Sequence, residues 1–223
     1  MLPLQTNFLL CLALLALLGL VWWGITSAQA PLANTKMNCY ITRCQQMENN
    51  FNKSFALVLK DEGGFETQTT DNGNKLPDGR AGSTNLGVTQ ANWEAFVGHP
   101  VTWNDMRALT PEKVTPFYKR KYWDVVHGDE LPNGVDYMAF DFAVNAGPGM
   151  AIKLLQRAVG VTQDGAIGPM TLSAIHAIPV NILIQRFSDA KEGFYKGLHN
   201  QTYEKGWLGR VSRVEIIATQ MVA

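Results

Sequence analysis

The first 35 residues of this chain carry no charged side chain, and this asymmetry constrains the fold more than any other feature. Residues 8–25 form an uninterrupted apolar run, FLLCLALLALLGLVWWGI. At about 1.5 Å of rise per helical residue, the run is long enough to cross roughly 30 Å of hydrocarbon. A buried helix of a soluble protein seldom lacks a polar face over such a length. The sequence therefore predicts an N-terminal membrane segment that directs the rest of the chain out of the cytoplasm.

The fate of residues 1–30 after export is open between three outcomes. Ala28-Gln29-Ala30 matches a small-x-small cleavage site. Cleavage is disfavoured because residues 1–7 lack Lys and Arg and because Pro31, which has no N–H, would follow the cut. Gly19 and the uncharged flanks predict weak anchoring, which favours later release from the membrane. Cleavage, release and a permanent anchor all place the following residues outside the cytoplasm.

Beyond this segment the composition is that of a folded protein. The chain is 46% hydrophobic and 17% charged, and its length suffices for one sizeable core or two small ones. Its 19 basic residues balance 19 acidic ones, which disfavours nucleic acid as a partner. Residues 31–46 contain Pro, Asn and Thr without periodicity and are expected to form a linker. We expect the folded part to begin at residue 47.

The first helix of the folded part is predicted to end at an acidic residue. Phe51, Phe55 and Val58 recur at helical spacing, and Gly63-Gly64 ends the pattern. Glu62 therefore lies at the negative end of the helix dipole, which disfavours its charged form and raises its pKa. A raised pKa suits a general acid, although a Glu at a helix end is by itself more often a solvated surface residue.

The residues around Glu62 resemble the catalytic signature of glycoside hydrolase family 108, muramidases found largely in phages and their hosts. The matching residues are Glu62-Gly63-Gly64-Phe65, then Asp71, then Thr84-Asn85-Leu86-Gly87-Val88-Thr89. The resemblance implies that Glu62 is the catalytic acid and that residues 84–89 lie across the cleft. The interval of nine positions between Glu62 and Asp71 is also similar to that in the small lysozymes of T-even phages. Glycoside cleavage uses one protonated carboxyl and commonly a second carboxylate.

The second carboxylate is open between two residues. Asp71 is the first choice, but the connection from Asn72 to Ser83 is longer than in the family pattern. Asp78 keeps a more usual distance to Thr84 and is the alternative. Either Asp is also a good turn former. Thr84 is expected to hold the water or orient the carboxylate, unless it only bonds locally within a strand.

Three further elements complete the predicted catalytic domain, residues 47–148. Helices are expected over 89–96, from Thr110 to about residue 123, and over 136–146. Phe117 to Trp123 resembles the F-Y-x-x-x-Y-W element of the family, whose aromatics we expect in the core and cleft wall. The predicted substrate contacts are Asn85, Asn145 and Gly64, and Asn145 could instead cap its helix.

Residues 149–178 resemble the peptidoglycan-binding module usually joined to family 108 domains. Its markers are Leu155-Gln156, Asp164-Gly165, Gly168-Pro169 and Thr171, although Asp164 and the glycines first build a turn. The chain beyond residue 181 is expected to be helical and to pack back on the core. We therefore predict a helical peptidoglycan-binding module over residues 149–223.

Export also bears on the cysteines. In an oxidising compartment Cys39 and Cys44 could close a small disulfide loop. Cys11 could attack that bond after release, a switch known in some released phage lysins, or could simply pack in its helix.

Together these features predict a mainly α, lysozyme-like α+β fold, with a helical bundle, a small β-hairpin region at 71–89 and an N-terminal transmembrane helix. The predicted activity is hydrolysis of the β-1,4 bond between N-acetylmuramic acid and N-acetylglucosamine by a monomeric phage endolysin. The enzyme would be held in the host inner membrane by residues 8–25, with its N-terminus in the cytoplasm, and then released to the periplasm. No cofactor or metal motif is present in the sequence. The alternatives are a lytic transglycosylase and a non-catalytic wall-binding or virion protein.

Overall fold

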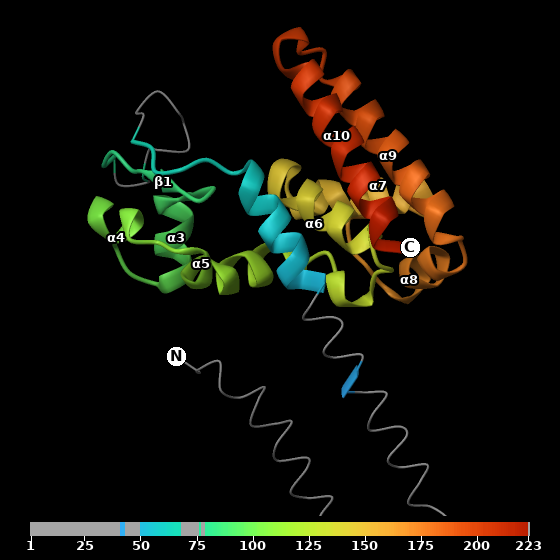
Figure 1. Cartoon of the computed structure of the whole chain (residues 1–223), viewed down its shortest axis with the longest axis horizontal. Helices are drawn as coiled ribbons and strands as arrows, with labels where there is room; N and C mark the ends of the chain where they lie inside the picture. Colours follow the sequence, from blue (N-terminus) through green and yellow to red (C-terminus); the bar gives the residue numbers. More distant parts are fainter. Residues whose placement is uncertain (1–40, 43–49, 68–75, 77–78, 223) are drawn as a thin grey trace, which may run out of the picture. The chain divides into compact units, whose positions relative to one another are not determined.

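The computed structural model describes residues 41–42, 50–67, 76 and 79–222, and those from residue 50 onward belong to one compact unit. This unit begins with a helix over residues 50–61, drawn in blue to cyan in Figure 1. Two short strands and a series of helices follow. In chain order they are β1 (Thr84–Asn85), β2 (Val88–Thr89), α3 (Gln90–Val97), α4 (Trp103–Arg107), α5 (Pro111–Tyr118), the π-helix η2 (Lys119–Trp123), the 3-10 helix η3 (Gly128–Glu130), α6 (Val135–Ala146), α7 (Pro148–Val159), α8 (Pro169–His176), α9 (Val180–Gly197) and α10 (Gln201–Val222).

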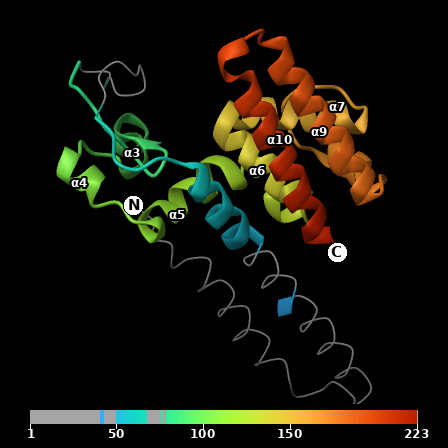
Figure 2. The same cartoon turned by 45° about the horizontal axis from the view of Figure 1, so that its top comes forward.

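Helix α6 forms the centre of this unit. It buries nine residues in succession, from Val135 to Ala143, because its sequence is apolar on nearly every side. Such a helix requires neighbours all around it, and α6 packs against η2, η3, α7, α9 and α10. Figures 1 and 2 show α9 and α10 as a helical hairpin at one end, and α3, α4 and β1 at the other. The expected mainly helical fold with a small antiparallel sheet is confirmed.

Local capping residues explain several helix starts. The Thr89 hydroxyl accepts a hydrogen bond from the Asn92 N–H at 3.4 Å and begins α3. Thr110 does the same for the Lys113 N–H, with Pro111 as the first residue of α5. Both caps satisfy N–H groups that have no partner within the helix. The helices expected to start here are confirmed.

Aromatic side chains fill the core between the first helix and α6. Phe51 lies edge-on to Trp123 and Phe140, with ring centroids 5.4 Å and 5.9 Å away. Phe55 lies 5.2 Å from Tyr118. Phe51, Tyr118 and Trp123 are all buried. The expectation that the aromatic side chains of residues 117–123 pack in the core is therefore confirmed for Tyr118 and Trp123.

A polar turn organises the C-terminal helices. Gln156 of α7 donates hydrogen bonds to Asp164 Oδ1 at 2.6 Å and to the Ala166 carbonyl at 2.9 Å, and accepts one from the Gly165 N–H at 2.9 Å. Gly165 has a φ of 81°, a value that favours glycine. The buried Thr171 hydroxyl lies 3.3 Å from the same Gln156 amide. The predicted markers of this region thus build the connection from α7 to α8.

Several predictions fall outside the described residues. These are the apolar run at 8–25, the linker apart from residues 41–42, the three cysteines, and both Asp71 and Asp78. Within the described residues, no helix combines the length and apolarity that a bilayer crossing needs. The two predicted domains, divided at residue 148, lie within the single unit, where α6 and α7 on either side of the division pack together.

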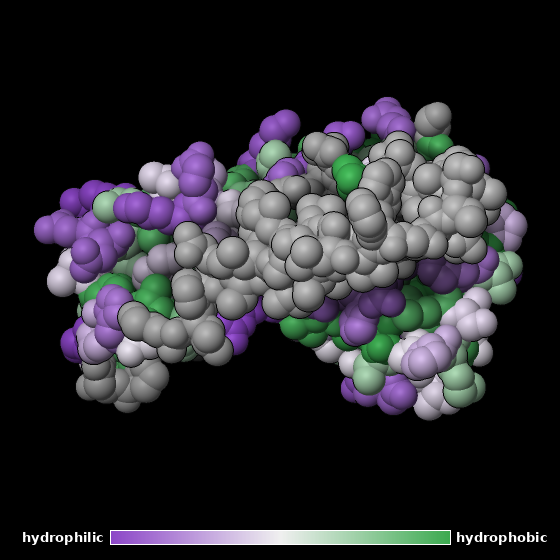
Figure 3. Space-filling view, turned by 90° about the horizontal axis from the view of Figure 1, so that it is seen from below, coloured by the Kyte–Doolittle hydropathy of each residue, from purple (hydrophilic) through white to green (hydrophobic). Residues whose placement is uncertain are grey.

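Surface polarity differs between the two ends of this unit. On the face seen in Figure 3, hydrophilic residues cover much of the end that holds α3 and α4. Around the C-terminal helices the same face carries a mixture of hydrophobic and hydrophilic residues. Met170 of α8 and Ile182 of α9 are among the exposed large hydrophobic residues, with exposed fractions of 81% and 49%.

Candidate active site

Glu62 is the residue immediately after the helix at 50–61 and is partly buried. Its side chain keeps 21% of its accessible surface, so the carboxyl group can reach a substrate while lying mostly in protein. The chain then turns through Gly63 and Gly64 before Glu66 pairs with Thr84, through two backbone hydrogen bonds of 2.8 Å. This pairing brings the hairpin at 84–89 next to Glu62.

The turn of this hairpin lies against the Glu62 carboxyl group. Leu86 and Gly87 have φ values of 50° and 70°, as a two-residue type I′ hairpin turn requires. A Cβ atom on Gly87 would lie 2.5 Å from both Glu62 Oε2 and the Tyr118 hydroxyl, so only glycine fits here. The Tyr118 hydroxyl donates a 2.8 Å hydrogen bond to the Leu86 carbonyl. Tyr118 thereby fixes the turn beside Glu62.

A charged network borders Glu62 on its other side. Arg210 of α10 places Nη2 3.9 Å from Glu62 Oε1. The same guanidinium donates hydrogen bonds of 3.0 Å and 2.8 Å to Asp141 Oδ1. Asp61 lies 3.9 Å from Arg210 and 3.5 Å from Arg213. Asp61 and Asp141 therefore both form ion pairs with arginines. The Glu62 carboxyl group, by contrast, has only the 3.9 Å contact with Arg210 among the ion pairs of the described residues.

The network continues into the core at Lys191 of α9. Its ammonium is 1% exposed and lies 3.8 Å from Asp141 Oδ2. In the described part of the chain it has no hydrogen-bond partner, and it lies 5.5 Å and 5.7 Å from the ring centroids of Phe142 and Phe187. Burial lowers the pKa of Lys191 to about 8, against the opposing effect of Asp141. Asp141 is thus held between two cations.

The surroundings of Glu62 raise its pKa. Burial is the largest cause, Arg210 opposes it, and the negative charges of Asp141 and Asp61 add to the rise. The direction expected from the sequence is confirmed, but desolvation rather than the helix dipole is its main cause. Burial raises the pKa of both Tyr118 and Tyr122, and the negative charge of Glu62 is the second cause. Both hydroxyls therefore stay protonated. A carboxyl group that retains its proton is suited to general acid catalysis.

Comparison with known proteins agrees with this geometry. Residues 55–147 match the model of the family described as glycosyl hydrolase 108. The solved structure of Brucella abortus SagA is 40% identical, with a TM-score of 0.67, and the match covers 78% of this chain and 97% of that chain. The chain belongs to glycosyl hydrolase family 108. No curated protein is similar enough to this family 108 hydrolase to count as a match.

A second match covers the C-terminal helices. Residues 150–212 match the model of a predicted peptidoglycan domain. Together the two matches make this protein a peptidoglycan-cleaving glycoside hydrolase. Arg210 and Lys191 lie within the second matched region, whereas Glu62 and Asp141 lie within the first. The surroundings of the candidate acid in this family 108 enzyme are therefore built by both regions.

Four of the other predicted site residues lie in the described part of the chain. Thr84 lies in β1, beside the turn that meets Glu62. Asn85 is 7% exposed, and its amide donates a 2.8 Å hydrogen bond to the Met106 carbonyl, which fixes α4 against the hairpin. Gly64 is exposed, with open space where a Cβ atom would lie. Asn145 is exposed in the last turn of α6.

The sequence alone did not identify Arg210, Lys191 or Asp61 as neighbours of Glu62. Asp61 precedes the predicted acid, but nothing in a single sequence shows which arginine neutralises it. Within the described residues, no group of three His, Cys, Asp or Glu side chains is arranged to hold a metal ion.

Proposed function

We propose that this hydrolase is an N-acetylmuramidase that cleaves the β-1,4 bond between N-acetylmuramic acid and N-acetylglucosamine. The observation that carries the proposal is the placement of Glu62, partly buried beside Gly87 with a raised pKa. Protonated Glu62 gives its proton to the glycosidic oxygen as the bond to the anomeric carbon breaks. Water then adds its oxygen to that carbon and gives one proton to the second carboxylate, which yields a reducing muramic end.

The second carboxylate of the reaction is proposed to be Asp71, with Asp78 as the alternative. Both lie in the connection between Glu66 and Thr84, whose ends are brought together by the Glu66–Thr84 pairing. The two carboxylates closest to Glu62 among the described residues, Asp61 and Asp141, are bound by arginines. This arrangement supports a catalytic partner outside the charged network. Separate Asp71→Asn and Asp78→Asn variants distinguish the two, since only the catalytic residue should lower kcat by a hundredfold or more, about the effect of general-base catalysis.

We further propose that the enzyme acts as a phage endolysin, exported through residues 8–25 and released to the periplasm as a monomer. The support is the apolar, charge-free sequence of that segment, with Ala and Gly at intervals. Cys39 and Cys44 would form a disulfide there, open to attack by Cys11. Fractionation of expressing cells over time tests this proposal. Release predicts an uncleaved chain that moves from the membrane to the soluble periplasmic fraction.

The catalytic proposal is tested with full-length protein in mild detergent on purified peptidoglycan. The parent and its Glu62→Gln variant are compared by mass spectrometry of the released sugars. We expect reducing muramic ends from the parent and almost no product from the variant, because Gln cannot donate the required proton. Anhydro-muramic ends from the parent would instead identify a lytic transglycosylase. Equal activity in both proteins would remove Glu62 from the reaction.

A further inference from the structure

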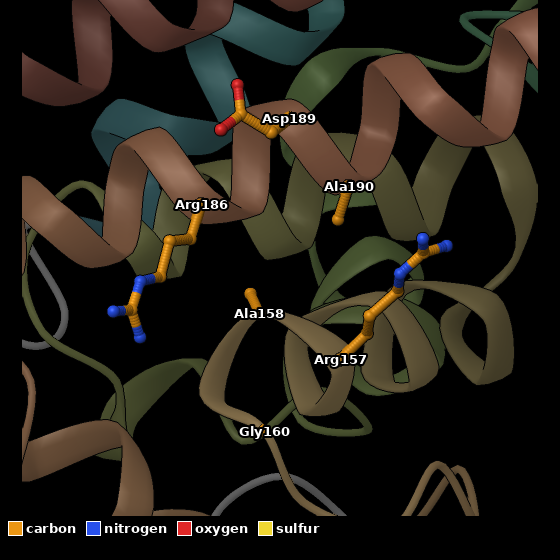
Figure 4. A pocket seen from close by; sticks show the side chains of 6 residues that line it. All are labelled: Arg157, Ala158, Gly160, Arg186, Asp189 and Ala190. Carbon is orange, nitrogen blue, oxygen red and sulfur yellow. The ribbon is translucent and has the colours of Figure 1, made fainter.

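A groove separate from Glu62 lies between the end of α7 and the first half of α9. Its volume is about 380 Å³, within the range of roughly 300–1,000 Å³ typical of ligand sites. Its lining residues are Arg157, Ala158, Gly160, Arg186, Asp189 and Ala190. Figure 4 shows the small side chains of Ala158 and Ala190 facing each other across the groove. The space is open because these positions carry almost no side chain.

Two guanidinium groups flank this space. Figure 4 shows Arg157 projecting from α7 and Arg186 from α9, toward opposite ends of the groove. Both residues are exposed. Neither has an ion-pair or hydrogen-bond partner for its side chain anywhere in the described part of the chain. The groove therefore presents two positive charges that the described protein does not neutralise.

The acidic residue of the groove does not neutralise these arginines. Asp189 lies three positions after Arg186 on α9, a spacing that permits an ion pair, yet none is formed. Its carboxylate instead accepts a 3.1 Å hydrogen bond from the Gln185 amide. Figure 4 shows this carboxylate directed away from the space between Ala158 and Ala190. The lining of the groove therefore carries two positive charges and one negative charge, a net charge of +1.

The lining indicates the chemistry of the ligand. Sugar rings are usually held by aromatic faces, and the residues of this groove include no aromatic side chain. Guanidinium groups instead match carboxylates, with which they form charge-assisted and often paired hydrogen bonds. In peptidoglycan the carboxylates are carried by the stem peptides, whereas the glycan backbone is largely uncharged. The groove also lies within residues 150–212, the region matched to a peptidoglycan domain.

We propose that this groove binds the stem peptides of peptidoglycan, with Arg157 and Arg186 each holding a carboxylate. The inference rests on the proposed function, since it names the part of the same polymer that the C-terminal region holds. The acid cluster at Glu62 and the groove are lined by different residues. The enzyme would thus bind the stem peptides in the groove while it cleaves the glycan at Glu62.

The test measures cosedimentation of the full-length chain with insoluble sacculi, in a Glu62→Gln background that prevents digestion. Arg157→Gln/Arg186→Gln is compared with Lys205→Glu, which changes the net charge by the same two units at an exposed position of α10. Intact sacculi are compared with insoluble chitin, an uncharged β-1,4 polymer of N-acetylglucosamine that carries no stem peptides. We expect the double variant to bind intact sacculi about tenfold or more weakly, equivalent to at least one lost charge-assisted contact.

Three further outcomes decide the proposal. Lys205→Glu should bind sacculi as the background does, and chitin should bind the background and the double variant equally. A soluble stem tripeptide should displace the background protein from intact sacculi. Equal binding of the double variant and the background to intact sacculi, or an equal loss in Lys205→Glu, overturns the proposal. If the parent releases no muramic ends while this binding pattern holds, the proposed bond specificity fails and the groove assignment stands.

Discussion

Arg210 Nη2 lies 3.9 Å from Glu62 Oε1, although the two residues belong to opposite ends of the folded unit's sequence. The cation opposes the effect of burial on the Glu62 pKa, while Asp141 and Asp61 support it. The acid strength of Glu62 is thus a balance between groups from three helical segments. Because a general acid works only while protonated, we expect the proposed role of Glu62 to make this balance set the upper pH limit of activity.

Removing the Arg210 charge should extend activity to higher pH. In Arg210→Met the pKa of Glu62 loses its main lowering influence, so the alkaline limb of kcat/KM should move to higher pH. The buried Asp141 also loses its closest partner, but Lys191 stays 3.8 Å from it, so the loss of stability should be smaller than about 3–5 kcal/mol, the cost of an uncompensated buried charge. Arg210→Lys keeps the charge and should leave the limb near its original pH. A limb that moves down in Arg210→Met would contradict the balance described above.

Removing the Asp61 charge should act in the opposite direction. Asp61 raises the pKa of Glu62, so Asp61→Asn should move the alkaline limb to lower pH. Its ion pairs with Arg210 and Arg213 are partly exposed, and their loss should change the unfolding free energy by less than about 1 kcal/mol. Activity profiles and chemical denaturation of the same preparation separate the two effects. An unchanged limb would show that Asp61 is too screened to act on Glu62.

Gly87 should be needed for activity rather than for the fold alone. In Gly87→Ala the new methyl group would meet both Glu62 Oε2 and the Tyr118 hydroxyl. We expect a loss of kcat of about tenfold or more as the acid is displaced. Gly98→Ala is the matched control, since Gly98 has a φ of 80° and open space around its missing side chain. Both variants should lose about 1–2 kcal/mol from backbone strain, and only the first should lose activity.

The contribution of Asp136 to the unfolding free energy should fall as the pH rises from 4 to 6. Burial raises its pKa from 3.8 to about 6, so in this interval the folded state retains a proton that the unfolded state has lost. The unfolding free energy contributed by this group therefore falls with rising pH and is constant above pH 6. In Asp136→Asn this fall is absent. The amide keeps an acceptor for only one of the two donors, because the Asn50 amide bonds Oδ2 of Asp136 and the Tyr137 N–H bonds Oδ1, and this loss lowers stability by an amount that does not depend on pH.

The measurement is the difference in unfolding free energy between Asp136→Asn and the parent across pH 4–7. As the pH rises, the unfolding free energy of the parent should fall relative to that of the variant by at most about 3 kcal/mol. This limit follows from the rise of the Asp136 pKa from 3.8 to about 6, because each pKa unit corresponds to about 1.36 kcal/mol. Taking a difference removes the contribution of the other titrating groups. A difference that stays constant with pH would show that Asp136 titrates alike in both states.

The sequence determined the elements whose causes are local. Thr89 and Thr110 begin their helices because a hydroxyl three residues before an N–H is enough to cap it. The Leu86-Gly87 turn and the Gln156–Asp164 connection likewise depend on residues close in sequence. The motif around Glu62 was sufficient to indicate the family and the candidate acid, because its residues are adjacent or joined by one hairpin.

Tertiary structure alone decided the electrostatics of that acid. Helix α10 returns across α6 and brings Arg210 to Asp141 and Glu62. The sequence predicted a raised pKa from the helix dipole, but the main cause is burial. Burial and long-range charge pairs depend on how distant helices pack, and one sequence does not specify which distant side chains meet. For this reason a candidate acid could be named from the sequence, while the groups that affect its pKa could not.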